Sequence, residues 1–254
     1  MEITEAQYRL IEHCLPIQRG NVSLSNLRVL NAILYVAEQG CKWRGLPKRF
    51  GKLAYRLYPH ESVVEERSAG SGVRTVATRS DRPHQDRSRG LGQHRRQSPS
   101  GWHGGAKKNG PQAIGKSRGG WTTKIHMVAA DARTAITFAL SPGQAHDAPE
   151  GRKLLRHLGK APWPLHLIMD RAYQGDETRQ LALDLGFIPV VPPKQNRVTA
   201  WQYKRAMYKR RNEIERLFRR LKGFRRIFSR FEKLDLMFIA FINFALIADG
   251  LRIV

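Results

Sequence analysis

Cysteine and acidic residues are scarce in this chain of 254 residues. Its two cysteines, Cys14 and Cys41, are too few for a disulfide framework or a four-cysteine zinc site. Only 21 Asp and Glu stand against 45 Lys and Arg, which gives a formal net charge of +24. A positive excess of this size favours a polyanionic partner, most simply nucleic acid. Hydrophobic residues make up 41% of the chain, enough for a core, so the composition argues against general disorder.

The sequence also lacks a signal peptide and an unambiguous membrane span. Glu2 and Glu5 occupy the start, where a signal peptide would be basic. The apolar run 234–254 is long enough to cross a bilayer, but its acidic residues would have no evident partner in lipid. We therefore predict a buried helix here, with a membrane span as the alternative. Together with the charge, these features favour a cytoplasmic, nucleoid-associated protein.

The first fifty residues have helical periodicity. Thr4 and Gln7 form a capping-box signal, and a second helix is predicted at about 23–39, where Gly40 ends it. A basic, aromatic loop follows. We interpret residues 1–50 as a helical N-terminal module that contacts DNA, with a plain helical hairpin as the alternative.

Residues 51–106 lack the hydrophobic period of a helix or a strand. They contain nine arginines but a single lysine, Lys52, and Ser and Gly recur. Taken alone, this composition is typical of a disordered basic linker.

A globular pattern resumes at residue 107. Alternating segments predict a hairpin made of residues 121–130 and 134–140, and two short apolar strands are predicted at 165–169 and 187–191. Helices are predicted at 149–158, 175–185, 201–222 and 234–254. This order of elements predicts a mixed α/β domain over residues 107–254.

Four polar residues share one narrow face of the long basic helix. At 100° per residue, Tyr208, Arg211, Glu215 and Lys222 fall at about 0°, −60°, −20° and −40°. A carboxylate flanked by cations stays ionised and is suited to hold a divalent metal. A solvated surface helix is the alternative, but residues 201–231 hold twelve Lys and Arg against two acids, which weakens it.

Asp170 is the second candidate, because it stands where the apolar strand 165–169 ends. A carboxylate at this end of a strand faces the crevice in which α/β proteins place their sites; a helix or turn cap is the alternative. Two carboxylates on a basic surface predict phosphoryl transfer with Mg²⁺. The usual arrangement would include a third acid close to Asp170 and Glu215.

These motifs resemble those of a known family. The motif Y-x2-R-x3-E-x6-K that begins at Tyr208 resembles the signature around the catalytic glutamate of bacterial insertion-sequence transposases of the DDE class, in the IS4/IS5-like group. The segment IMDRAYQG at 168–175 resembles the one that carries their second aspartate. Residues 110–126 and 142–151 also resemble this group.

The resemblance implies an RNase-H-like mixed sheet flanked by helices, which cuts and rejoins DNA at the ends of a mobile element. Asp170 and Glu215 would be two of three acids around a two-Mg²⁺ site. The implied partners are terminal inverted repeats and target DNA, bound by a homodimer or a larger assembly. His146 and Asp147 are expected in a loop near the site, with a helix cap as the alternative. The residues expected to contact DNA are Tyr208, Arg211, Lys222, Lys116 and Arg118.

Such transposases need a first aspartate on the first core strand. Upstream of the hairpin the chain offers only Asp81 and Asp86, and neither lies on an apolar strand. If the codons of Gly92–Gln97 are read one base later, the sequence Asp-Ser-Thr-Val-Val is permitted. We therefore interpret residues 52–104 as translated out of frame, with a divergent linker as the alternative.

This interpretation predicts a chain that binds DNA but transposes poorly or not at all, because one of three metal-binding acids is missing. It also predicts that the first core strand is lost and that residues 51–106 are poorly ordered. A non-catalytic DNA-binding remnant is the alternative function. A ribosomal-type RNA-binding protein would explain the charge but not the shared face of the basic helix.

Overall fold

The structure is a computed structural model that describes residues 2–18, 24–51, 88–97 and 110–253. The N-terminal segment contains two α-helices, α1 (Glu5–Ile11) and α2 (Asn26–Gln39), and three 3-10 turns. These turns are η1 (Glu12–Cys14), η2 (Trp43–Gly45) and η3 (Lys48–Phe50).

The predicted helix ends of this segment are confirmed. Thr4 Oγ1 accepts a hydrogen bond from the Gln7 backbone N–H, and the Gln7 side chain accepts one from the Thr4 backbone N–H. Helix α2 ends at Gly40, which has a left-handed backbone with φ of 65°. The start of α2 is later than predicted, because Ser25 caps it by accepting from the Arg28 N–H.

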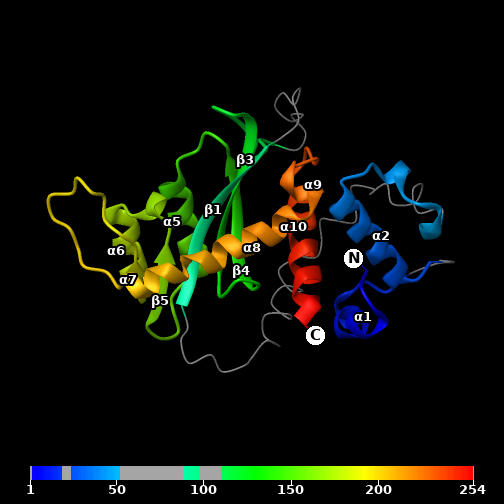
Figure 1. Cartoon of the computed structure of the whole chain (residues 1–254), viewed down its shortest axis with the longest axis horizontal. Helices are drawn as coiled ribbons and strands as arrows, with labels where there is room; N and C mark the ends of the chain where they lie inside the picture. The colour runs from blue at the N-terminus through cyan, green and yellow to red at the C-terminus, as the bar shows by residue number, and fades with distance from the viewer. Residues whose placement is uncertain (1, 19–23, 52–87, 98–109, 254) are drawn as a thin grey trace.

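One sheet of six strands forms the centre of the molecule (Figure 1). The order is β2-β3-β1-β5-β6, and β4 pairs with β3. The predicted hairpin is confirmed, since β3 is antiparallel to both β4 and β1. Strand β5 is parallel to β1 and β6. The strands are β1 (Ser88–Gln97), β2 (Gly115–Ser117), β3 (Gly120–Ala129), β4 (Ala135–Pro142), β5 (Leu165–Met169) and β6 (Phe187–Val190).

Strand β1 is present in the sheet, contrary to the prediction that the first core strand is lost. Residues 88–97 form a central strand between β3 and β5, so the predicted loss of the first core strand is wrong. Its backbone groups pair on both sides, and this pairing does not require the apolar alternation by which strands are recognised in a sequence. The expectation of poor order in the rest of 51–106 falls on 52–87 and 98–106, which lie outside the described residues.

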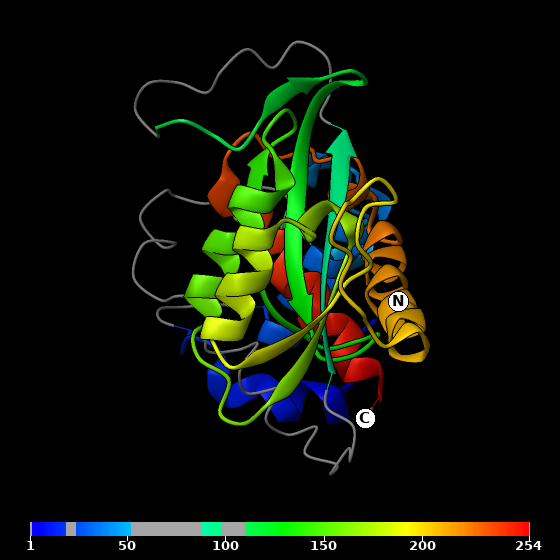
Figure 2. The same cartoon turned by 90° about the vertical axis from the view of Figure 1, so that its left-hand side faces the viewer.

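Helices cover both faces of the sheet (Figures 1 and 2). Helices α5 (Asp147–Leu158) and α6 (Asp176–Asp184) pack on one face, against Val128, Leu165 and Leu167. Helices α8 (Asn212–Lys222), α9 (Arg225–Phe228) and α10 (Asp235–Gly250) pack on the other, against Ile125 and Met127. The alternation along β3 produces this division.

The N-terminal segment shares the core of this second face. Tyr8 and Leu34 belong to the same buried cluster as Ile214 and Phe238. A hydrogen bond from Gln7 Nε2 to the Leu251 carbonyl, 2.8 Å long, adds a contact between α1 and the end of the chain. Burying each large apolar side chain stabilises the fold by about 1.5–3 kcal/mol. The N-terminal helices therefore pack as part of one body with the sheet.

The long basic helix differs from its prediction. It begins at Arg205 rather than residue 201 and is divided into α7 (Arg205–Tyr208), a 3-10 turn η6 (Lys209–Arg211) and α8. In the tighter 3-10 turn, side chains three residues apart are eclipsed, and Arg210 Nε donates to Glu213 Oε1 at 3.1 Å. Upstream, Trp201 Nε1 donates to the Val191 carbonyl, which holds the preceding segment in a non-helical path.

Helix α10 is shorter than the apolar run that predicts it, and a 3-10 turn, η7 (Leu251–Ile253), follows. None of the helices in the described part of the chain has the length and apolar character needed to span a bilayer. Phe238 and Ile242 are fully buried in the core.

Candidate active site

Asp170 lies where β5 ends and begins the 3-10 turn η5 (Arg171–Tyr173). Its carboxylate accepts a hydrogen bond from the Arg171 N–H at 2.6 Å, so it does cap a turn, as the alternative interpretation predicts. The side chain nevertheless stays partly exposed. Two residues earlier, Ile168 lines the same small pocket as Arg210 and Ile214. Strand alternation therefore places Asp170 on the face of the sheet that α8 covers.

Tyr208, Arg211 and Glu215 form a continuous group next to this turn. The Arg211 guanidinium pairs with the Glu215 carboxylate, and it also lies 5.9 Å from the centre of the Tyr208 ring. The pair places a positive charge directly beside the Glu215 carboxylate. Its side chain remains 46% exposed, which leaves oxygen lone pairs available to a ligand.

Electrostatics places Asp170 beside this group. The pKa of the Tyr208 phenol is raised, mainly by burial. The positive charge of Arg211 opposes this rise, whereas the negative charge of Asp170 adds to it and that of Arg171 opposes it again. The pKa of Tyr208 therefore responds to charges close to it on its own chain segment and to charges that follow β5. Tyr208 is therefore linked to Asp170 through its charge and to Arg211 by contact, and Arg211 is linked to Glu215 by an ion pair.

Lys222 lies apart from this group. It is exposed at the last turn of α8, seven residues beyond Glu215, which corresponds to about 10 Å along the helix. The described residues contain no group of three His, Cys, Asp or Glu able to hold a metal ion. Asp170 and Glu215 are therefore candidate ligands without a third acid among these residues.

Strand β1 passes directly beside Asp170. The parallel pairing of β1 and β5 runs up to Leu91 opposite Met169, so Gly92 is the next residue, level with Asp170. On its other side Gly92 pairs with Met127, which faces the core under α8. Residues directly opposite in an antiparallel pair share a face. Position 92 therefore lies on the same face as Asp170, about 4.8 Å away in the neighbouring strand.

The basic hairpin is more distant from the site. Lys116 and Arg118 are exposed at the β2–β3 turn. Lys116 pairs with Trp121 on β3. Trp121 is six residues along β3 from Met127, which pairs with Gly92. At about 3.3 Å per residue, this places the hairpin cations about 20 Å from the Asp170 row, beyond the end of β1.

His146 and Asp147 stand at the start of α5. His146 occupies the cap position, but its side chain makes no capping hydrogen bond. Asp147 Oδ1 accepts a hydrogen bond from Lys124 Nζ at 2.7 Å, and the Lys124 side chain is only 3% exposed. Asp147 thus neutralises a buried lysine, on the face of the sheet opposite α8.

A buried polar chain next to the site was missed by the sequence analysis. His126 Nδ1 lies 2.8 Å from the Tyr173 hydroxyl, and His126 Nε2 lies 2.8 Å from Ser141 Oγ. The Tyr173 backbone N–H donates to the Asp170 carbonyl, so the chain supports the turn that carries Asp170. The available signal was the alternation of Lys124 and His126 with apolar residues, which places both on one face of β3.

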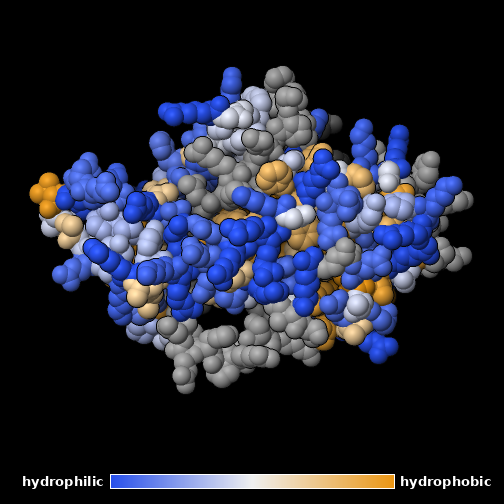
Figure 3. All heavy atoms as spheres, in the orientation of Figure 1, coloured by the Kyte–Doolittle hydropathy of each residue, from blue (hydrophilic) through white to orange (hydrophobic). Residues whose placement is uncertain are grey.

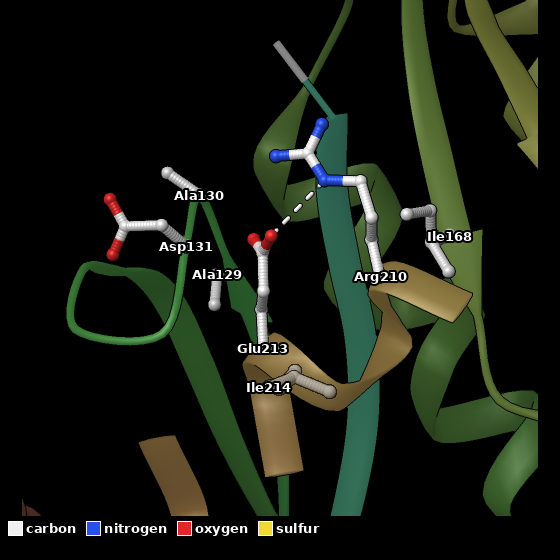
Figure 4. A pocket seen from close by; sticks show the side chains of 7 residues that line it. All are labelled: Ala129, Ala130, Asp131, Ile168, Arg210, Glu213 and Ile214. Carbon is white, nitrogen blue, oxygen red and sulfur yellow. Dashed lines mark hydrogen bonds and ion pairs between the residues drawn. The ribbon is translucent and has the colours of Figure 1, made fainter. Parts of the chain in front are cut away.

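The small pocket in Figure 4 lies on the other flank of α8. Glu213 points into it and accepts a hydrogen bond from Arg210. Asp131 points into its own loop, where its Oδ1 accepts hydrogen bonds from the Arg133 and Thr134 backbone N–H groups. Both acids therefore have partners. Glu213 and Glu215 are two residues apart on a helix, so their side chains leave on nearly opposite sides. The pocket is not the predicted site.

Comparison with known proteins identifies the class. Residues 88–248 match the model of the transposase DDE domain, and residues 3–58 match that of a putative transposase of the IS4/5 family. A putative transposase for insertion sequence element IS6501 of Brucella ovis is 31% identical over 132 residues, which is 52% of this chain and 99% of that protein. No solved structure matches the chain.

The first match covers more than half of the chain, and it includes the central sheet, Asp170 and α8. The molecule is thus an insertion-sequence transposase, and the chain belongs to the DDE transposase family. Transposases bind DNA, and DDE domains depend as a class on divalent metal ions. The predicted resemblance is confirmed at this level.

Proposed function

We propose that this chain derives from a transposase that cuts and joins DNA at the ends of its element, and that it lacks one of three metal-binding acids. The observation that carries the proposal is the position of Gly92 beside Asp170, on the face that α8 covers. Gly92 is also the residue whose codon permits an aspartate when it is read one base later.

The strand order supports an RNase-H-like fold. Strands β4, β3 and β1 form an antiparallel set, and β5 and β6 continue from β1 in parallel. In open sheets with parallel strands, active sites form at the carboxyl ends of those strands. Asp170 occupies this place at the end of β5.

Asp170 and Glu215 are suited to hold Mg²⁺, because this ion takes carboxylate oxygens as protein ligands. Held by these residues, Mg²⁺ would supply Lewis-acid stabilisation for the negative charge that phosphoryl transfer develops on oxygen. Asp170 presents its carboxylate at the end of β5, and Arg211 pairs with the carboxylate of Glu215. Without an acid at position 92, these two residues are insufficient for a two-ion site, so this chain cuts DNA poorly.

DNA contacts are proposed at several distances from Asp170. Tyr208 and Arg211 would contact or order phosphates close to the cleaved bond, and Lys222, at the last turn of α8, would contact phosphates farther along. Lys116 and Arg118 would contact the duplex about 20 Å away, which corresponds to about six base pairs. This division follows from the hairpin's position beyond the end of β1.

The remaining assignments are proposals of the same kind. The N-terminal segment 1–50 would contact DNA, terminal inverted repeats and target DNA would be the partners, and the active assembly would be a homodimer or larger. A cytoplasmic, nucleoid-associated location follows from DNA binding. The alternative function is a DNA-binding remnant, which the same positive charge supports.

A gain-of-function experiment tests the proposal. Element-end DNA is incubated with Mg²⁺ and either the unsubstituted chain, the Gly92→Asp variant or the uncharged Gly92→Asn control. We expect nicking only by Gly92→Asp. Efficient nicking by the unsubstituted chain would refute the proposal that a metal-binding acid is missing. Inactivity of the Gly92→Asp variant would favour the alternative function, a DNA-binding remnant. The gene offers a separate check: if the shifted frame from codon 53 contains no Asp-Ser-Thr, the frameshift interpretation fails.

A further inference from the structure

The cations of the basic helix and the turns after it fall into two groups. Those of the first group are each paired with a carboxylate. The pairs join α8 and the following turns to one another and to the core, and all of the paired arginines are at least partly buried. They are Arg210–Glu213, Arg211–Glu215, Arg220–Asp249, Arg226–Glu232 and Arg230–Asp235.

The second group has no carboxylate partner among the described residues and is exposed to solvent. Its members follow one another along α7, η6, α8 and the start of α9. We call them the outer cations: Arg205, Lys209, Arg216, Arg219, Lys222 and Arg225. Surface charges are ordinarily balanced by neighbours of opposite sign. Here the available acids are used by the inward arginines, so the positive charge of the outer row is left uncompensated.

The outer cations of α8, which are Arg216, Arg219 and Lys222, lie outside its buried face. The buried face is made by Ile214, Leu217, Phe218 and Leu221. Figure 3 shows the resulting surface: strongly hydrophilic side chains form a band over α8 on the face seen in Figure 1. The band is therefore accessible along its length to a large ligand.

The length of the row fits a duplex backbone. From Arg205 to Lys222 the helical segment rises by about 25 Å, at about 1.5 Å per residue. Successive phosphates of one DNA strand advance about 3.4 Å along the duplex axis, so the row covers about seven base pairs. The cations recur every three to seven residues, a spacing that allows each to meet a separate phosphate.

The composition of the row argues against other polyanions. Single-stranded nucleic acid is usually held by aromatic side chains on which bases stack, but none of the exposed residues between 205 and 222 is aromatic. A membrane surface would require an apolar helix face to insert, and the apolar face of α8 is packed on the sheet.

We propose that the outer cations bind the phosphate backbone of duplex DNA laid along α8. The proposal rests on the proposed function, because it assigns the path of the DNA that the site would cut. At one end of the row, Lys209 adjoins Arg210, which lines the same pocket as Ile168, two residues before Asp170. The other end lies at Arg225, whose side chain packs against Gly40 at the end of α2. The row thus leads DNA from the site towards the N-terminal segment.

The test compares two double variants of equal charge change by titration of labelled duplex DNA at several salt concentrations. The first is Arg216→Gln with Arg219→Gln. The matched control is Arg156→Gln with Lys160→Gln, exposed residues at the end of α5 on the other face of the sheet. The slope of log K against log salt is negative, and each lost phosphate contact reduces its magnitude by about 0.9. For the first variant we expect the magnitude to fall by about 1.8, with roughly tenfold weaker binding per lost contact at 0.1 M salt. For the control we expect no change.

Three outcomes would overturn the inference. An unchanged slope for the first variant would show that DNA binds elsewhere on the protein. If the unsubstituted chain still binds duplex DNA in that experiment, the proposed function is not contradicted. Equal losses in both variants would indicate a response to net charge alone. Displacement by single-stranded DNA as effective as by duplex would contradict the assigned ligand. If the unsubstituted chain binds no duplex at all, the proposed function itself fails.

Discussion

The Tyr173 hydroxyl lies 2.8 Å from Nδ1 of the fully buried His126. This hydrogen bond connects the turn that begins at Asp170 with the middle of β3, and Ser141 on β4 continues it through the second ring nitrogen. Neutral imidazole has one donor and one acceptor nitrogen, and each hydroxyl can donate or accept, so uncharged His126 can form both hydrogen bonds.

Acidification is expected to destabilise the protein through His126. Burial lowers the pKa of His126; the charges of Asp147 and Glu150 oppose this shift, and that of Lys124 adds to it. A histidine with a lowered pKa in the folded state takes up its proton more readily when unfolded, so its contribution is present above about pH 6.5 and is lost as pH falls. Thermal unfolding from pH 8 to pH 5 measures the effect. The His126→Gln variant should show a smaller decline over this range; an equal decline would exclude His126 as the cause.

Removing the Tyr173 hydroxyl should weaken the fold. Tyr173→Phe leaves His126 without one buried partner, at a cost of about 1–3 kcal/mol. Tyr208→Phe is the matched control, because Tyr208 is only partly buried. Urea unfolding of both variants gives the comparison. Equal stability of the two would show that the buried bond contributes nothing.

Removal of either candidate metal ligand should abolish the activity gained at position 92. In the Gly92→Asp background, Asp170→Asn and Glu215→Gln each remove an ionised oxygen ligand, and Mg²⁺-dependent nicking should fall by at least about a hundredfold. Glu213→Gln is the control, since this side chain lies on the other flank of α8 and bonds Arg210. A loss with Glu213→Gln as large as that with Glu215→Gln would point to a different site.

Gly40 should tolerate no side chain. Its φ of 65° is unfavourable for other residues, and an added Cβ would lie 3.2 Å from both Arg225 Cγ and Phe231 Cε2. We expect Gly40→Ala to destabilise the protein by about 1–3 kcal/mol in chemical unfolding. Gly119→Ala is the control, because an added Cβ there meets nothing within 4 Å. A similar effect of both substitutions would contradict the role of Gly40 in docking α2.

The sequence predicts local elements well where a short-range signal exists. The Thr4–Gln7 capping box, the end of α2 at Gly40 and the hairpin around Asp131 all depend on residues within a few positions of each other. Strand β1 was not predictable in this way. Its place is determined by long-range pairing with β3 and β5, for which its Gly- and Arg-rich sequence gives no signal.

The site was predictable in part for the same reason. The spacing of Tyr208, Arg211 and Glu215 is local, and the structure keeps these residues in contact despite the 3-10 turn before α8. The buried partners of the Asp170 turn come from β3 and β4, far away in the sequence. Their contacts emerge only when the sheet has formed.

The shared core of the N-terminal helices and the sheet has a consequence for how the gene can change. Tyr8 and Leu34 share one buried cluster with Ile214 and Phe238, so packed side chains join the two regions in addition to the connection between residues 51 and 88. Mutations can therefore accumulate in that connection without releasing the N-terminal helices.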